Sequence, residues 1–211
     1  MGKKSPGRPA DPAKDQAILA AGRRLLFDRG PEAVTMAAVA AAAGVAKPTL
    51  YRRYANRDEL LAAIARAEAE HMSERFCTAP ASRDDVRQAL EDFAERLTTF
   101  MLSDEHIRFI HALAQARGLS ASAREAIYRN GPRQTRERLS RFFARAHREG
   151  LIHSPDPERS AERFLGMLMG LDLVRTLYQI RDAADPAARA REVVHDFLYL
   201  CDRKAQAASD D

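Results

Sequence analysis

The chain has 211 residues, enough for one large domain or two small ones. Its mean hydropathy of −0.43 and the lack of any run near the ~18 apolar residues of a membrane span predict a water-soluble protein. The first 60 residues hold 11 Lys/Arg against 6 Asp/Glu, a balance of +5 in a chain of net charge +4, which favours nucleic acid as the partner. No secretory signal is visible, and two widely separated cysteines, Cys77 and Cys201, favour a reducing, cytoplasmic location.

Residues 1–10, MGKKSPGRPA, form a basic arm with nothing to bury. One interpretation is a flexible, solubilising tail. The other is an arm whose turn around Arg8 enters a narrow A·T-rich minor groove, as homeodomain arms do. Asp11 then predicts the N-cap, and Pro12 the first position, of a helix that runs to about Asp28. Its inward stripe consists of Ile18, Ala21, Leu25 and Leu26.

The next segment predicts a helix, a tight turn and a second, shorter helix. Thr35 is a good N-cap, and Val34 and Val39 occupy the two positions of a hydrophobic staple. Gly44 ends the first helix because glycine adopts the left-handed conformation without steric cost. The second helix then runs over two turns from Lys47 to Tyr54.

This second helix has two distinct faces. Leu50 and Tyr54 are four residues apart and share the inward face. The outward face carries Lys47, Pro48, Tyr51 and Arg52. Cations and hydroxyls on a short exposed helix suit phosphates and guanine edges in a DNA major groove. Asn56 caps a third helix with Glu59 as capping-box partner, and Arg57 at its first position is a candidate phosphate clamp.

The segment resembles the N-terminal DNA-binding domain of the TetR/AcrR family of bacterial transcriptional regulators, and the resemblance covers about residues 10–62. It is carried by Thr35, Val39, Ala40, Ala43, Gly44, Val45, Thr49, Leu50, Tyr51, Tyr54, Arg57, Glu59 and Leu60. The chain departs from the family at Ala46, where Ser or Thr is usual, and so gives up an N-cap worth roughly 1 kcal/mol. Arg57 stands where the family usually has Lys.

The two-faced helix and the resemblance together predict the residues at the DNA. These are Thr35, Lys47, Pro48, Thr49, Tyr51, Arg52, Arg53 and Arg57. Lys47 is the candidate for a guanine O6/N7 contact, Thr49 and Tyr51 are expected to hold phosphates, and Arg53 and Arg57 to clamp the backbone.

The remainder of the chain predicts an all-α fold of two domains. A helix from Arg57 to about Phe76 links the DNA-binding domain, residues 11–62, to a C-terminal domain, residues 63–207, and Thr78–Ser82 interrupts the helices after it. Residues 208–211 form a tail. The later helices are expected at about Val86–Phe100, Asp104–Arg117, Ser120–Arg129, Pro132–Glu149, Pro157–Ile180 and Pro186–Ala207.

The last two of these helices predict a homodimer. The helix of residues 157–180 is apolar nearly all round and therefore needs cover on two sides, while Gly166 and Gly170 permit close approach of another helix. The resemblance implies the same, because TetR-family members dimerise through their last two helices as a four-helix interface. A purely intramolecular core is the alternative.

The motifs of enzymes and metal sites are missing from the sequence. The six histidines show no paired ligand spacing, and each is more typical of a surface or partly buried residue than of a metal ligand. No nucleophile elbow, P-loop or dinucleotide motif occurs. We therefore expect no enzyme, no metal and no cofactor. Cys77 is a weak candidate for a redox sensor, and Cys201 is expected as a thiol at the subunit interface.

The resemblance implies a small-molecule pocket inside the C-terminal bundle. The candidate lining residues are Phe93, Leu97, Phe109, Leu113, Phe142, Met167 and Tyr178, although each of them alone is more typical of a core position. Asp172 and Arg175 lie three apart in an apolar helix, where burial requires a partner. They are expected to pair with each other or across the dimer; anchoring a ligand is the alternative.

The sequence thus favours a DNA-binding transcriptional regulator, in particular a repressor that a small-molecule inducer releases from a palindromic operator. Two-fold symmetry sets its reading helices about 34–36 Å apart, one turn of B-DNA. The alternative is an all-helical ligand-binding or interaction protein that no longer engages DNA. Activation in place of repression stays open, because the position of the operator decides it.

Overall fold

The computed structural model describes residues 12–178, 180 and 185–209. The arm of residues 1–10, the Asp11 cap and the end of the tail, residues 210–211, lie outside the described residues. Every regular element in the described part is a helix, which confirms the all-α fold class. The elements are α1 (Pro12–Arg29), η1 (Pro31–Ala33), α2 (Met36–Ala42), α3 (Lys47–Tyr51), α4 (Arg57–Met72), η2 (Glu74–Cys77), α5 (Arg83–Leu102), α6 (Asp104–Gln115), α7 (Ala121–Asn130), α8 (Pro132–Arg148), α9 (Pro157–Met169), α10 (Asp172–Leu177) and α11 (Pro186–Ser209).

Side-chain caps begin α2 and α4 where the sequence predicts them. The backbone N–H of Ala38 donates to Thr35 Oγ1 at 3.1 Å, and the N–H of Glu59 donates to Asn56 Oδ1 at 2.9 Å. The reciprocal bond of the capping box differs by one residue, because the Glu59 carboxylate accepts from the N–H of Ala55 and not of Asn56. Among the described helices, none is long and apolar enough to cross a membrane.

Three predicted helices end earlier than expected. The prediction of one helix over residues 157–180 is wrong. The chain turns at Gly170, whose φ of 45° lies in the left-handed region, so α9 and α10 are separate helices. α4 stops at Met72, and the short 3-10 helix η2 takes up the rest of its predicted length. α3 is one turn shorter than predicted, because Arg52 and Arg53 lie in the turn that follows it.

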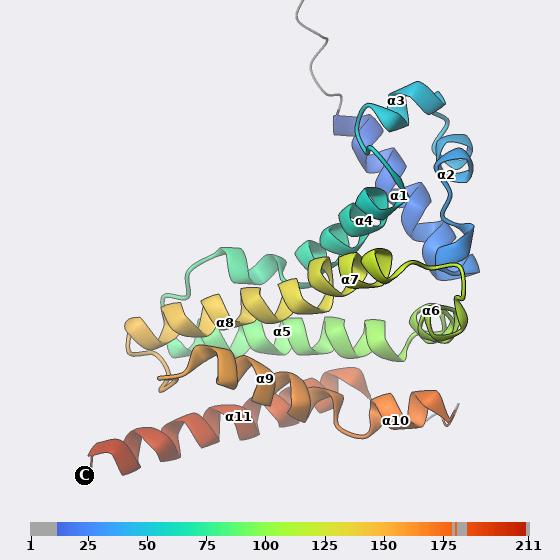
Figure 1. Cartoon of the computed structure of the whole chain (residues 1–211). Helices are drawn as coiled ribbons and strands as arrows, with labels where there is room; N and C mark the ends of the chain where they lie inside the picture. Colours follow the sequence, from blue (N-terminus) through green and yellow to red (C-terminus); the bar gives the residue numbers. More distant parts are fainter. Residues whose placement is uncertain (1–11, 179, 181–184, 210–211) are drawn as a thin grey trace, which may run out of the picture.

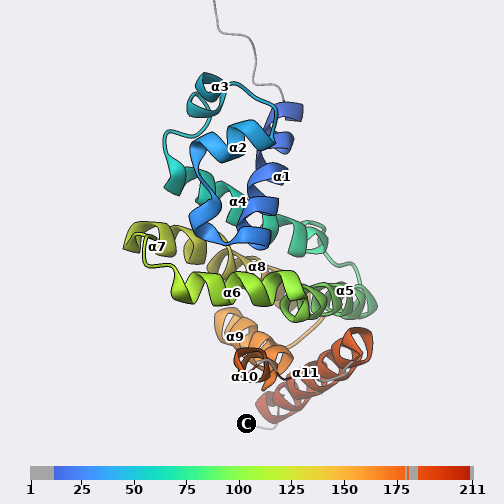
Figure 2. The same ribbon diagram turned by 90° about the vertical axis from the view of Figure 1, so that its right-hand side faces the viewer.

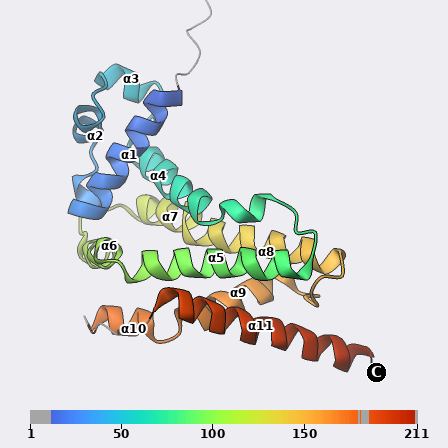
Figure 3. The ribbon, with the colours of Figure 1, turned by 180° about the vertical axis from the view of Figure 1, so that it is seen from behind.

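The bundle core fills the space between α5, α8, α9 and α11. α11 packs along α5 and α8 along α9, and Figures 1 and 3 show these four helices as the long lower part of the molecule. Its aromatic centre, with neighbouring ring centroids 4.7–6.4 Å apart, consists of Phe76, Phe93, Phe142, Phe143, Phe164 and Phe197.

A second core, which we call the N-terminal core, holds α1 to α4 but is not confined to them. Its members from the first helices include Ile18, Leu26, Phe27, Val34, Val39, Leu50, Leu60, Leu61 and Ile64. Its members from α6, α7 and the segment between them are Phe109, Ala116, Leu119, Ala123 and Ile127. Figure 2 shows α6 and α7 directly beneath α1, α2 and α4. The first four helices therefore share their core with helices of the C-terminal part.

Candidate nucleic-acid interface and effector cavity

The outward face of α3 is open at the end of the molecule farthest from α11 (Figures 1 and 2). This α3 face comprises Lys47, Pro48 and Tyr51 of α3 and Arg52 of the turn directly after it, all of them exposed. On the opposite side Leu50 is completely buried in the N-terminal core, and Tyr54 is partly buried against the same core. The structure thus confirms the inward and outward faces that the four-residue spacing predicts.

The turn between α2 and α3 is fixed by backbone hydrogen bonds. Gly44 has a φ of 65°, its N–H donates to the carbonyl of Ala41 at 3.2 Å, and the N–H of Val45 donates to the carbonyl of Ala40 at 3.0 Å. These are the two bonds of a Schellman motif, which requires the left-handed residue between them. Ala46 supplies no side-chain cap to α3. The orientation of α3 therefore depends on this turn and on the buried side chain of Leu50.

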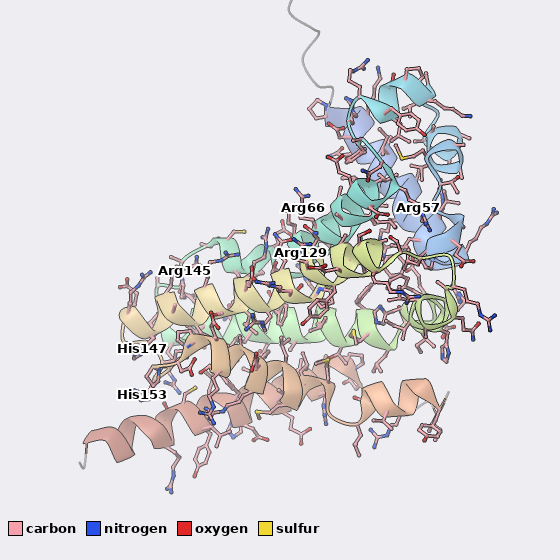
Figure 4. All side chains as sticks on the ribbon, in the orientation of Figure 1. Arg57, Arg66, Arg129, Arg145, His147 and His153 are labelled. Carbon is pink, nitrogen blue, oxygen red and sulfur yellow. The ribbon has the colours of Figure 1, made fainter. Side chains whose placement is uncertain are left out.

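The two arginines expected at the DNA backbone are bound inside the domain. Arg53 Nε donates to Asp15 of α1 at 2.6 Å, and its side chain is only 11% exposed. Arg57 donates from Nε to the carbonyl of Val34 at 2.8 Å and from Nη2 to that of Pro31 at 2.6 Å. Figure 4 shows Arg57 beside the segment that joins α1 to α2, away from the end where α3 lies. These bonds tie α3 to α1 and α4 to η1.

The two predicted threonines lie in different settings. Thr35 is exposed at the start of α2, where its oxygen accepts the capping bond and its O–H remains able to donate. Thr49 is half-buried on α3. Their contacts with phosphates stay predictions, as do those of Arg53 and Arg57.

The predicted pocket residues do not line a common space. The bundle core takes up Phe93, Phe142 and Met167, and the N-terminal core takes up Phe109 and Leu113. Tyr178 is 74% exposed, and Leu97 alone of the seven lines a cavity between α5, α6, α9 and α10. This cavity has a volume of about 20 Å³, which is room for about one water molecule. Its apolar wall consists of Leu97, Met101, Leu102, Ile110, Leu168 and Met169.

Three polar residues complete the cavity wall: Thr98, His106 and Asp172. His106 is 7% exposed and so lies deeper than the surface or partly buried position expected of the histidines, and burial lowers its pKa to about 4. Its position on α6 carried a signal, since Phe109 and Ile110 follow at helical spacing and mark an apolar face. Asp172 accepts a bond from Arg175 at 2.7 Å, which is the first of the two predicted pairings.

Large apolar side chains are exposed along the last helices of the chain. They are Leu171, Val174, Tyr178, Ile180, Tyr199 and Leu200. At Gly166 on α9, a Cβ atom would meet nothing within 4 Å. Cys77 is exposed, whereas Cys201, expected at a subunit interface, is buried in the protomer's own bundle core.

Two family models together match most of the chain. Residues 18–64 match "Bacterial regulatory proteins, tetR family", and residues 88–199 match "AefR-like transcriptional repressor, C-terminal domain". Among curated proteins, an uncharacterized HTH-type transcriptional regulator of Mycobacterium tuberculosis is 27% identical over 190 residues, which are 87% of this chain and 93% of the relative.

Solved structures agree with these matches over nearly the whole chain. A TetR transcriptional regulator from Agrobacterium tumefaciens is 27% identical with a TM-score of 0.68, covering 89% of this chain and 93% of that one. The flavonoid-responsive regulator FrrA is 25% identical with a TM-score of 0.64, covering 90% and 98%. The chain therefore belongs to the TetR family of bacterial transcriptional regulators and is a DNA-binding regulator.

Proposed function

We propose that this regulator is a homodimeric repressor that binds a near-palindromic operator through α3 and leaves it when a small molecule binds the C-terminal bundle. The observation that carries the proposal is the α3 face, on which two cations and a phenol hydroxyl point to solvent from a helix anchored by the buried Leu50. A helix of only five residues is marginal alone, so this buried anchor is what presents the face in a fixed orientation.

Lys47 is assigned the base contact, because it stands at the first position of α3 and is exposed. Thr49 and Tyr51 are assigned to phosphates. Lys47→Ala should cost about 1–3 kcal/mol and relax specificity at one base position, whereas Arg52→Ala should weaken binding to all sequences alike. Binding of both variants to a panel of singly substituted operators measures this difference. An even loss across the panel for Lys47→Ala contradicts the assignment.

The dimer is assigned to the last helices, where large apolar side chains are exposed on and beside α10 and on α11, and where α9 has an exposed glycine at Gly166. Several exposed apolar side chains on neighbouring elements are typical of an interaction surface. Gly166→Leu would add a side chain to this surface at a position where a Cβ atom meets nothing within 4 Å. Equilibrium sedimentation should show a dimer for the wild type and a weakened one for the variant; an unchanged dimer places the interface elsewhere.

The effector is assigned to the bundle because ligand-induced release is typical of the family and because the relative FrrA is named for its response to flavonoids. Selection of bound sequences from a random duplex library at near-physiological salt tests the function as a whole. One recovered palindrome supports a sequence-specific dimer. Recovery of no motif from a well-folded dimer favours instead an all-helical ligand-binding protein that does not engage DNA.

A further inference from the structure

The cavity between α5, α6, α9 and α10 contains buried polar atoms that have no partner within the described part of the chain. These atoms are Thr98 Oγ1 and both ring nitrogens of His106. Thr98 is 5% exposed and His106 is 7% exposed, and both residues line the cavity. Buried side-chain polar atoms in native proteins are nearly always paired, so three of them at one small cavity call for an explanation. A molecule in the cavity with a polar atom of its own, either a water or a ligand, would pair them.

The charges around the cavity define what such a molecule can be. His106 is neutral near pH 7, because burial lowers its pKa to about 4, and it therefore offers one donor and one acceptor. The Asp172 carboxylate lines the cavity and is bound to Arg175 at 2.7 Å. An anionic ligand would face that carboxylate in a low-dielectric setting. A hydroxyl group, which both donates and accepts, matches a neutral imidazole and a threonine hydroxyl.

We propose that this cavity is the effector site and that it takes a neutral, mainly apolar molecule whose single hydroxyl group pairs with Thr98 and His106. The inference rests on the proposed function, in which an effector binds the bundle. The apolar wall includes Met101 and Met169, whose flexible thioether side chains repack readily around a ligand larger than the present 20 Å³.

The position of His106 connects this cavity to the DNA-binding segment. Its ring packs against Phe100 at 4.5 Å and Phe109 at 6.1 Å between centroids, and both of these rings pack against Phe27 of α1 at 5.7 and 5.0 Å. The preceding residue, Glu105, accepts a bond from Arg23 of α1 at 2.9 Å. A ligand that widens the cavity therefore displaces α6 against α1, on which α2 and α4 also pack.

Phenol, toluene and benzoate are matched probes of this site, because they share one ring and differ in the group that meets His106. Their binding to the full-length protein is followed by methyl NMR of Met101 and Met169. We expect phenol to bind at least about tenfold more tightly than toluene, because toluene leaves the buried polar atoms unpaired. Benzoate should not bind at neutral pH. Equal affinity for phenol and toluene, or no binding of phenol, overturns the proposal.

Two variants, each of which removes one polar side chain from the cavity, test the residues themselves. Thr98→Val and His106→Phe should each reduce the preference for phenol over toluene by about fivefold or more, since each removes one hydrogen-bonding partner. Thr135→Val is the matched control: Thr135 is a buried threonine outside this cavity, and its hydroxyl donates to the carbonyl of Gly131. An unchanged preference in both cavity variants overturns the proposal. Operator affinity is measured in parallel without probe. A variant or wild type that fails to bind DNA contradicts the proposed function, whereas the probe preferences test the cavity.

Discussion

Replacing Arg57 by alanine should destabilise the fold before it affects any contact with DNA. The change removes two hydrogen bonds from a charged donor to the carbonyls of Val34 and Pro31, at 2.8 and 2.6 Å. A hydrogen bond to a charged group contributes about 1.5–3 kcal/mol. The Pro31 carbonyl keeps its bond from the N–H of Val34, and water can reach the half-buried site, so the expected loss is about 2–3 kcal/mol. Without these two bonds, η1 and the start of α2 are no longer hydrogen-bonded to α4.

Urea unfolding at a fixed protomer concentration measures this loss, since the stability of a dimer depends on concentration. Arg52→Ala is the control, because it removes the same charge from an exposed residue of the α3 face and should change stability by less than about 0.5 kcal/mol while weakening DNA binding. Unchanged stability in Arg57→Ala combined with a uniform loss of DNA affinity would refute the reasoning. Arg57 would then serve the phosphate clamp that the sequence predicts.

Three further changes probe the turn, the α1 contact and the cavity. Gly44→Ala should cost about 1–2 kcal/mol in urea unfolding, because the φ of 65° strains any side chain even where space is open. Asp15→Asn should lower the melting temperature by weakening its 2.6 Å bond to Arg53, with a smaller effect in high salt. The free energy of unfolding of the wild type should fall by up to about 3 kcal/mol as pH falls from 6.5 towards 4, because His106 takes up a proton in the unfolded chain before it does in the folded one. The free energy of unfolding of His106→Phe should fall less over the same interval.

Much of the fold could be predicted because its signals are local. Thr35 and Asn56 cap their helices through atoms three residues away, and Gly44 ends α2 through its own backbone. The break at Gly170 escaped prediction, because a glycine within an apolar helical pattern is compatible with either close helix packing or a turn. The partner that holds the end of α9 comes from another part of the chain, because Arg189 Nη2 of α11 donates to the carbonyl of Met167 at 3.2 Å.

The site divides in the same way. The α3 face follows from a spacing of four residues, and the structure agrees with it. The partners of Arg53 and Arg57 lie 38 and 23–26 residues away in sequence, so charge and position alone suggested phosphate contacts. The cavity joins residues of α5, α6, α9 and α10, and no periodicity within one helix reveals which of them meet.

The shared N-terminal core has a practical consequence for anyone who builds chimeric regulators from this chain. Modular engineering joins the DNA-binding helices of one protein to the sensing bundle of another, with the seam after the third or fourth helix. A junction at residue 62 in this chain would separate Leu60, Leu61 and the neighbouring core residues from Phe109, Ala123 and Ile127, which belong to the same core. A transplant that carries α6 and α7 with the first four helices, or that copies these apolar side chains into the recipient, keeps both sides of the core together.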